Sequence, residues 1–431
     1  MLEPSAITAE MNWKPRFFAI WTGQALSLIG SVLTNFVLVW WITQTTGSAS
    51  ALAAAGIAAL LPVAIFSPPG GALADRFSRR AIMFVTDVIT AGCMVVLVLL
   101  FATERIELWH AYTLMFVRAT MQAFQQPAAA ASTVNLVPPE FVPRAAGMNQ
   151  ALQGVLSIAG APLGALAMSA LPIQGALSID IVTALVGVTP LLLFRIPQPL
   201  APEYEGPHSL LHSMMEGARY VLRSRGLREL YFVIGLVVFT VMPTFALTPL
   251  LVTQHFGGGI NQVAIMEGIA GIGVILGGVA ISVWPPTRGR IVVALLSFSA
   301  SCGAVALTAL SGSQMLWLAI VWWFISGVTF STGNAPMTTI MQTTIPNVMQ
   351  GRAFSLLNMV FGLAGPLGLL IAGPMGEAFG VRMVFIVGGT LSAIICAGGL
   401  LSPALRNIEG SMPIPAAHEI EGTPAPEYLE G

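Results

Sequence analysis

Three ionisable residues lie deep inside long apolar segments of the sequence: Arg118, Asp87 and Asp180. Arg118 is about ten residues into its segment, which places it roughly 15 Å from the segment's start and near the centre of a bilayer. A charge at that depth needs an oppositely charged partner or water. Because burial disfavours the charged form of a carboxyl group, Asp87 or Asp180 could carry a proton whose release depends on Arg118 or on water. A fixed ion pair between Arg118 and one of these acids, which would only hold helices together, explains the same residues equally well.

Polar side chains recur at helical spacing along four apolar segments. They are Gln24, Ser27, Ser31, Thr34 and Asn35 in the first segment, Arg118, Gln122, Gln125 and Gln126 in the fourth, Thr240, Thr244 and Thr248 in the seventh, and Ser326, Thr329, Thr332 and Asn334 in the tenth. Lipid offers polar groups no partner, so such stripes are typical of helices that line a water-filled path. We predict a substrate cavity formed by Gln24, Ser27, Ser31, Asn35, Arg118, Gln122, Gln126, Thr244, Thr248 and Thr329. In the seventh and tenth segments, hydrogen bonds to neighbouring carbonyl groups are an equally good explanation.

A charged turn separates the second and third apolar segments: Gly70-Gly71-Ala72-Leu73-Ala74-Asp75-Arg76-Phe77-Ser78-Arg79-Arg80. Its aspartate and three arginines must lie at a membrane surface, since unpaired charges are expensive in lipid. Three arginines together indicate the cytoplasmic surface. The two glycines before the charges would let neighbouring helices approach closely.

The composition is that of a polytopic membrane protein. Charged residues make up 9% of the 431 residues, AVILMFWYC make up 55%, and the mean hydropathy is +0.82, whereas soluble domains carry about 25% charged residues. At about 20 residues per span, the chain has room for about twelve helices. A net charge of -1 gives no indication of a nucleic-acid partner. The sequence has no phosphate loop, metal-ligand spacing or nucleophile with a base, so we expect no enzyme activity, no metal and no cofactor beyond a proton gradient.

The apolar segments form two halves that repeat one another. We expect six helices at about 16–44, 49–74, 81–101, 108–134, 146–170 and 173–194, and six more at about 230–252, 262–283, 291–310, 314–343, 354–378 and 383–401. Val137-Pro138 and Arg144-Ala145 return 208 residues later as Ile345-Pro346 and Arg352-Ala353, which indicates a duplicated unit. The expected organisation is an N-terminal tail (1–13), an N-terminal six-helix bundle (14–196), a linker (197–228), a C-terminal bundle (229–403) and an acidic disordered tail (404–431).

The linker contains apolar residues at helical spacing, among them Leu211, Met215 and Val221, opposite charged residues such as Glu216 and Arg219. This pattern predicts an amphipathic helix at the cytoplasmic membrane surface. A solvated helix without lipid contact fits equally well.

The basic residues predict the orientation. Arg105 and Arg382 fall on one side of the expected spans and Arg118 lies within one, so 15 of the 18 basic residues fall on the other side. Basic loops stay in the cytoplasm, so both termini should be cytoplasmic in a bacterial inner membrane.

The charged turn resembles the signature loop between helices 2 and 3 of the major facilitator superfamily of secondary transporters, with Ser78 in place of a usual glycine. Arg118-x-x-x-Gln122 resembles the family's second signature, whose arginine is implicated in proton coupling. Gly160-Ala161-Pro162-Leu163-Gly164 resembles the antiporter signature of exporters, with Ala161 interrupting the usual Gly-Pro order. With Gln125-Gln126-Pro127-Ala128 and Ile179-Asp180, residues 15 to 403 are similar to the macrolide-efflux type of drug:proton antiporter.

This resemblance implies an all-α membrane protein of twelve transmembrane helices in two pseudo-symmetric six-helix bundles. It implies a monomeric exporter that exchanges amphiphilic small molecules for protons by alternating access. The expected roles are a conformational latch (Gly71, Asp75, Arg76, Arg79, Arg80), proton coupling (Arg118, Asp87, Asp180) and a hinge in the fifth helix (Gly160, Pro162, Gly164). Two alternatives stay open: transport of a metabolite such as a siderophore, sugar or lipid, and a membrane receptor or scaffold that transports nothing.

Overall fold

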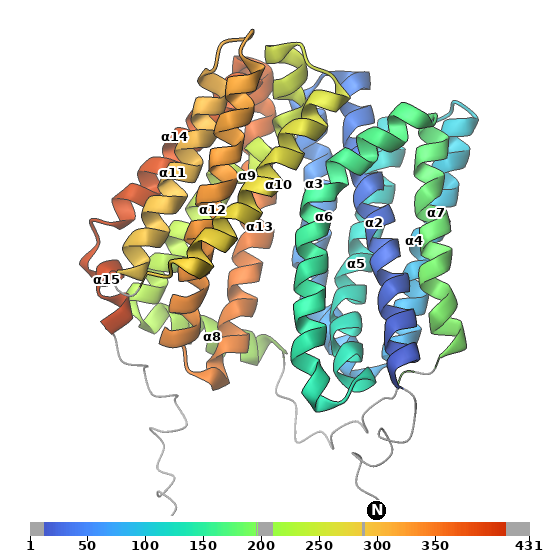
Figure 1. Cartoon of the computed structure of the whole chain (residues 1–431), viewed down its shortest axis with the longest axis horizontal. Helices are drawn as coiled ribbons and strands as arrows, with labels where there is room; N and C mark the ends of the chain where they lie inside the picture. Colours follow the sequence, from blue (N-terminus) through green and yellow to red (C-terminus); the bar gives the residue numbers. More distant parts are fainter. Residues whose placement is uncertain (1–12, 195, 197–209, 287–288, 411–431) are drawn as a thin grey trace, which may run out of the picture.

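The computed structural model describes residues 13–194, 196, 210–286 and 289–410, apart from the side chains of Asp75, 210–214, Asn347 and Val348. In this part of the chain every regular element is helical. The long helices stand in two bundles side by side (Figure 1). This confirms the predicted fold class.

Each bundle has six long helices. The first contains α2 (Trp13–Thr46), α3 (Ala49–Arg76), α4 (Arg79–Ala102), α5 (Leu108–Leu136), α6 (Val142–Ala170) and α7 (Ile173–Leu193). The second contains α9 (Arg225–Phe256), α10 (Ile260–Val283), α11 (Arg290–Leu310), α12 (Leu316–Thr344), α13 (Asn347–Phe379) and α14 (Val381–Gly399). Shorter helices are η1 (Pro139–Phe141), α8 (Leu210–Arg223), α15 (Pro403–Arg406) and η2 (Ile408–Gly410).

Eleven of the described helices are long and apolar enough to cross a membrane by length and composition. The remaining long helix, α5, packs closely on α3 and α4 within the first bundle. Its mean hydropathy is lower because it carries Arg118 and the glutamines Gln122, Gln125 and Gln126. The least apolar of the twelve long helices is therefore the one that contributes most to the polar site described below.

Two predicted boundaries need correction. The second bundle begins at Arg225, not near 230, because Ser224 caps α9 by accepting a hydrogen bond from the Leu227 amide at 3.4 Å. The chain beyond α14 stays folded as far as Gly410, since Leu405 and Ile408 are buried and Glu409 accepts from the Ile291 amide at 2.8 Å. The predicted disordered tail is therefore wrong for 404–410, and 411–431, 1–12 and 197–209 lie outside the described residues.

The amphipathic helix α8 packs on the second bundle. Tyr220 and Val221 join the buried core of that bundle, and Glu216 forms a 2.6 Å ion pair with Arg352 of α13. Its apolar face therefore covers α9 and α13 in part, while Met215 stays exposed. Contact with protein was not among the two interpretations drawn from the sequence.

Among the described residues, the two bundles share an apolar core at one end and have separate cores at the other. Where α2 and α9 finish, Leu38, Leu52 and Leu250 belong to a single buried cluster that draws on both bundles. Where α2 and α9 begin, each bundle has its own cluster, around Phe17 in the first and Leu230 in the second. We call these the joined end and the separated end; they are the upper and lower ends in Figure 1.

Candidate functional site

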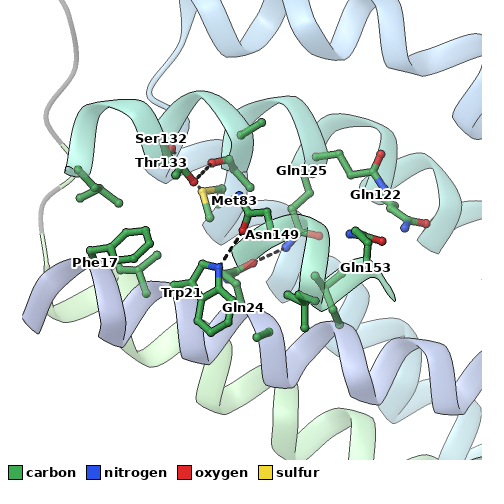
Figure 2. Close-up of a pocket in the computed structure, with 18 residues that line it drawn as sticks. Phe17, Trp21, Gln24, Met83, Gln122, Gln125, Ser132, Thr133, Asn149 and Gln153 are labelled. Carbon is green, nitrogen blue, oxygen red and sulfur yellow. Dashed lines mark hydrogen bonds between the residues drawn. The ribbon is translucent and has the colours of Figure 1, made fainter. Parts of the chain in front are cut away.

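A pocket of about 430 Å³ lies in the first bundle at the separated end, between α2, α5 and α6 (Figure 2). Its apolar walls include Phe17, Ile20, Trp21, Leu28 and Met83, and its carboxamides are Gln24, Gln122, Gln125, Gln126, Asn149 and Gln153. Small-molecule sites typically enclose about 300–1,000 Å³ with mostly apolar walls and a few polar groups. The pocket has the size and the mixed character of such a site.

One side of the pocket is fixed by a hydrogen bond between α2 and α6. Trp21 Nε1 donates to Asn149 Oδ1 at 2.8 Å (Figure 2). The indole keeps its apolar ring on the pocket wall and satisfies its only donor, which is how buried tryptophans are normally accommodated. Nothing in the spacing of these two residues shows that their helices meet there, so the contact could not be predicted from the sequence.

Asp87 of α4 is buried directly beside this pocket, with 3% of its surface exposed. Gln24 Nε2 donates to Asp87 Oδ2 at 2.9 Å, and Gln125 Nε2 donates to Asp87 Oδ1. Gln125 Nε2 also donates to Gln24 Oε1 at 3.0 Å. Both carboxyl oxygens are thus held by neutral amides that line the pocket, so a molecule that moves either glutamine changes the environment of Asp87.

Arg118 pairs with Asp180 and not with Asp87. Its Nη2 lies 2.8 Å from Asp180 Oδ2, and the side chains are 12% and 1% exposed. Ser31 Oγ donates to Asp180 Oδ1 at 3.4 Å. The close approach of α2 and α7 that permits this contact occurs at Gly30, where an added Cβ would lie 2.1 Å from Thr183 Oγ1. Of the two partners that the sequence left open, the structure selects Asp180.

Of the other predicted cavity residues, some line the pocket and some are buried in the packing between helices. Gln122 and Gln126 line the pocket, whereas Ser27 is buried against Gly187 of α7 and Asn35 is exposed. Thr244 and Thr248 are fully buried and donate to carbonyl groups of their own helix, Val241 O at 2.7 Å and Thr244 O at 3.0 Å. Thr329 likewise donates to Ile325 O at 2.7 Å. These threonine contacts are of the kind expected from the helix-packing alternative.

The arginines of the charged turn bind helix ends within the first bundle. Arg79 Nη1 donates to Ala131 O of α5 at 2.9 Å, and Arg80 Nη2 donates to Leu192 O of α7 at 2.9 Å. Carbonyl groups near a helix C-terminus favour such cations. The Asp75 side chain lies outside the described residues and Arg76 is exposed, while Ser78 caps α4 through the Ala81 amide at 3.3 Å. The serine that departs from the family pattern therefore has a local role at the start of α4.

The glycines near the turn have different surroundings. An added Cβ at Gly70 would lie 2.4 Å from Ala123 O, so this glycine allows α3 to approach α5. A Cβ at Gly71 would meet no described atom within 4 Å. The predicted close approach is therefore made at Gly70.

The proposed hinge segment belongs to one continuous helix, α6, with Pro162 inside it. Added Cβ atoms at Gly160 and Gly164 would lie 2.3 Å from Val32 Cγ1 and 2.4 Å from Phe36 Cδ1 of α2. Both glycines therefore serve the packing of α6 on α2. Bending at this segment stays a prediction.

The joined end carries polar contacts between the bundles that the sequence analysis missed. Glu377 of α13 accepts from Ser48 Oγ and from the Ser50 amide, the latter at 3.1 Å, at the start of α3. Gln254 Nε2 of α9 donates to Gly47 O at 2.7 Å. A carboxylate at a helix N-terminus is favourable, and here it comes from the opposite bundle. The only sign of this contact in the sequence was the position of Glu377, an acid near the end of the predicted eleventh helix.

The described residues contain no group of three or more metal-ligating side chains. Two helical bundles with a shared core at one end, and a polar pocket beside the buried Asp87 at the other, are an arrangement typical of a membrane transporter.

The chain belongs to the Major Facilitator Superfamily, whose family profile matches residues 20–369. It is 30% identical to Macrolide efflux protein A of Streptococcus pyogenes over 403 residues, covering 92% of this chain and 97% of the relative. It is 24% identical to the multidrug efflux pump Tap of Mycolicibacterium fortuitum over 396 residues, covering 88% and 94%. The family resemblance drawn from the motifs is thereby confirmed, and the chain is a multi-pass secondary transporter.

Solved structures agree on the fold. A bacterial homolog of the human lysosomal transporter Spinster, inward-facing and unoccupied, matches with a TM-score of 0.67 at 15% identity, covering 99% of this chain and all of that one. The nucleoside transporter NupG matches with a TM-score of 0.69 at 14% identity, covering 91% and 99%. At these identities the likeness concerns the fold alone.

Proposed function

We propose that this protein exports amphiphilic small molecules, including macrolide-like compounds, in exchange for protons by alternating access. The observation that carries the proposal is the buried Asp87, whose two oxygens are held by Gln24 and Gln125 from the wall of a largely apolar pocket. A protonatable group in contact with the substrate site is what coupling requires, because each ligand can then alter the other's affinity. The efflux relatives support the direction of transport.

In this proposal, the separated end faces the cytoplasm, as the distribution of basic residues indicates. Substrate enters the pocket from that side and contacts Trp21 and Phe17 through its apolar part. Its polar groups compete for Gln24 and Gln125, which loosens their hold on the Asp87 carboxylate. Proton uptake and release at Asp87 then alternate with substrate occupancy, while Arg118 and Asp180 stay paired with each other. Because one chain forms the pocket and both charged groups, we expect a monomer.

The test replaces Asp87 with Asn, which keeps the shape and one of the two oxygen acceptors but cannot release a proton. In proteoliposomes with an imposed pH gradient, the wild type should accumulate a macrolide and the D87N variant should not. D87N should still bind the macrolide, since its pocket walls are unchanged. Glu104→Gln, an exposed acid near the joined end, serves as the matched control and should transport normally. Gradient-driven accumulation by D87N at the wild-type rate would rule out Asp87 as the coupling group.

A susceptibility panel distinguishes a drug exporter from a metabolite carrier with the same fold. Expression in a pump-deficient bacterial host should raise resistance to several amphiphilic compounds if the protein is a drug exporter. Unchanged susceptibility, together with proton flux driven by a sugar, siderophore or lipid, would replace the export proposal with the metabolite alternative.

A further inference from the structure

A second cavity, of about 440 Å³, lies on the outer side of the second bundle at the separated end. It is formed by the start of α9 and by the chain from the end of α14 into α15, with Arg228, Phe232, Gly398 and Ser402 among its lining residues. The transport pocket is in the other bundle, so this groove is not part of it.

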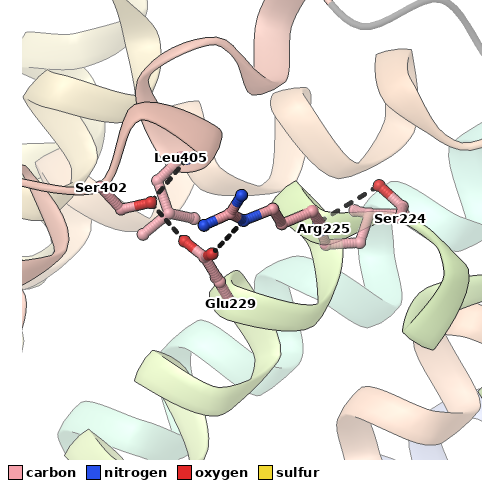
Figure 3. A network of polar contacts seen from close by, with 6 residues as sticks. Ser224, Arg225, Glu229, Ser402 and Leu405 are labelled. Atoms are coloured by element: carbon pink, nitrogen blue, oxygen red, sulfur yellow. Dashed lines mark hydrogen bonds and ion pairs between the residues drawn. The ribbon is translucent and has the colours of Figure 1, made fainter.

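One end of the groove carries a polar network around Glu229 (Figure 3). Glu229 Oε1 lies 3.1 Å from Arg225 Nε, and Glu229 Oε2 accepts from Ser402 Oγ. Both oxygens of the acid are therefore occupied within the protein. The Arg225 side chain is 76% exposed and contacts Glu229 through Nε, while Arg228 on the next turn is also exposed. The surface of the protein at this end of the groove therefore has a net positive charge.

The other end of the groove is apolar and open. Phe232 is 70% exposed, two turns along α9 from Arg225. A Cβ added at Gly398 would meet no described atom within 4 Å, so α14 leaves an indentation there. Along α14 the exposed surface continues with Ile394, 61% exposed. The distance from the charged to the apolar part is roughly 10 Å at 1.5 Å per helical residue.

We propose that this groove binds an anionic phospholipid, with its phosphate at Arg225 and Arg228 and one acyl chain against Phe232 and the indentation at Gly398. Charge complementarity selects this occupant: basic side chains at a membrane surface attract anionic headgroups, and an adjoining apolar surface at the hydrocarbon level accommodates the chain. Arginine binds phosphate well because its planar donors match the phosphate oxygens. The lipid would hold the start of α9 against α15, in the bundle opposite the transport pocket.

The test measures binding of phosphatidylglycerol and phosphatidylcholine to the purified full chain in detergent, by native mass spectrometry and by the shift of the melting temperature. The wild type should retain phosphatidylglycerol in preference to phosphatidylcholine. Each basic residue near an anionic headgroup contributes a factor of about five, so Arg228→Gln should bind phosphatidylglycerol about fivefold more weakly and R225Q/R228Q about thirtyfold more weakly. Arg105→Gln, an exposed arginine at the joined end, is the charge-matched control and should bind normally.

A second variant tests the apolar half without changing charge. Gly398→Leu fills open space, so the protein should fold normally while the acyl chain is displaced and lipid retention falls. Normal retention by both R225Q/R228Q and G398L would overturn the proposal. So would stabilisation by inorganic phosphate equal to that by phosphatidylglycerol, since the groove would then be an anion site without a lipid, and so would equal retention of the two lipids.

Discussion

The joined end and the separated end are held together by different kinds of contact. At the joined end the bundles share an apolar core and exchange polar contacts, Glu377 with Ser48 and Ser50, and Gln254 with Gly47. At the separated end each bundle has a core of its own, and the contacts of Arg79 described above stay within the first bundle. The contacts that hold the two bundles together are therefore concentrated at the joined end.

The polar contacts of the joined end are suited to repeated opening. The Glu377 contacts are exposed, so water can replace them at little cost when the bundles part. The buried Arg118–Asp180 pair, by contrast, is expensive to break because a desolvated charge would be left without its partner. A rocking motion should therefore break the contacts between the bundles and leave the buried pair intact.

Locking the joined end should have the largest effect. In a cysteine-free background, S48C/E377C links α3 to α13 when oxidised or bridged by a short thiol reagent. Transport should fall to the background rate, because the bundles cannot part at that end, and reduction should restore it. The two single-cysteine variants receive the same treatment as controls. Full transport by the cross-linked protein would show that the joined end need not open.

Removing Asp75, the acid of the charged turn, should have the next effect in size. The sequence predicts that Asp75 helps to close the separated end in the other state by contact with a helix N-terminus, which contributes up to about 2 kcal/mol, or roughly thirtyfold. Asp75→Ala should therefore lower transport by up to that factor and leave the amount of protein in the membrane unchanged. Glu140→Ala removes an exposed acid at the same end and should transport normally. Wild-type rates for D75A would remove the latch role.

A pair of glycine substitutions compares the ends directly. An added Cβ at Gly376 would lie 2.6 Å from Ala49 Cβ in the opposite bundle, whereas one at Gly147, near the start of α6 at the separated end, meets no described atom within 4 Å. Overpacking costs about 1–3 kcal/mol, so Gly376→Ala should shift the population towards an open joined end by roughly 5- to 150-fold. Gly147→Ala makes the same change of residue within a helix and should shift nothing.

The readout for this pair is thiol labelling of Leu250→Cys, which lies fully buried in the joined core. Labelling by a membrane-impermeant maleimide should be faster in G376A and unchanged in G147A. Equal labelling rates in the two variants would mean that packing at Gly376 does not set the equilibrium.

Loss of the Glu377 charge should have the smallest effect. Glu377→Gln keeps an acceptor for Ser48 and Ser50 but removes the charge at the start of α3, and the site is exposed and screened. We expect a severalfold rise in the labelling rate of L250C at low salt, which falls as salt is added. Labelling that does not depend on salt in E377Q would exclude an electrostatic contribution.

The sequence predicted the fold because apolar segments of membrane length and a charged turn of fixed spacing are local patterns. It could not choose between Asp87 and Asp180 for Arg118, since depth along a helix does not give the direction of a side chain. The glutamines Gln24 and Gln125 were recognised as polar, but their joint hold on Asp87 depends on how α2, α4 and α5 pack together. Glu377 was missed for the same reason, because its partners lie 327 and 329 residues away.

The ion pair between Glu216 and Arg352 fastens α8 to α13. With Tyr220 and Val221 buried against the same bundle, α8 must travel with the second bundle whenever the two halves reorient. A fluorophore attached at Met215, which is 59% exposed, would then report the position of the second bundle. Paired with a dye on the first bundle, it would convert each transport cycle into a change of energy transfer that can be followed in single molecules.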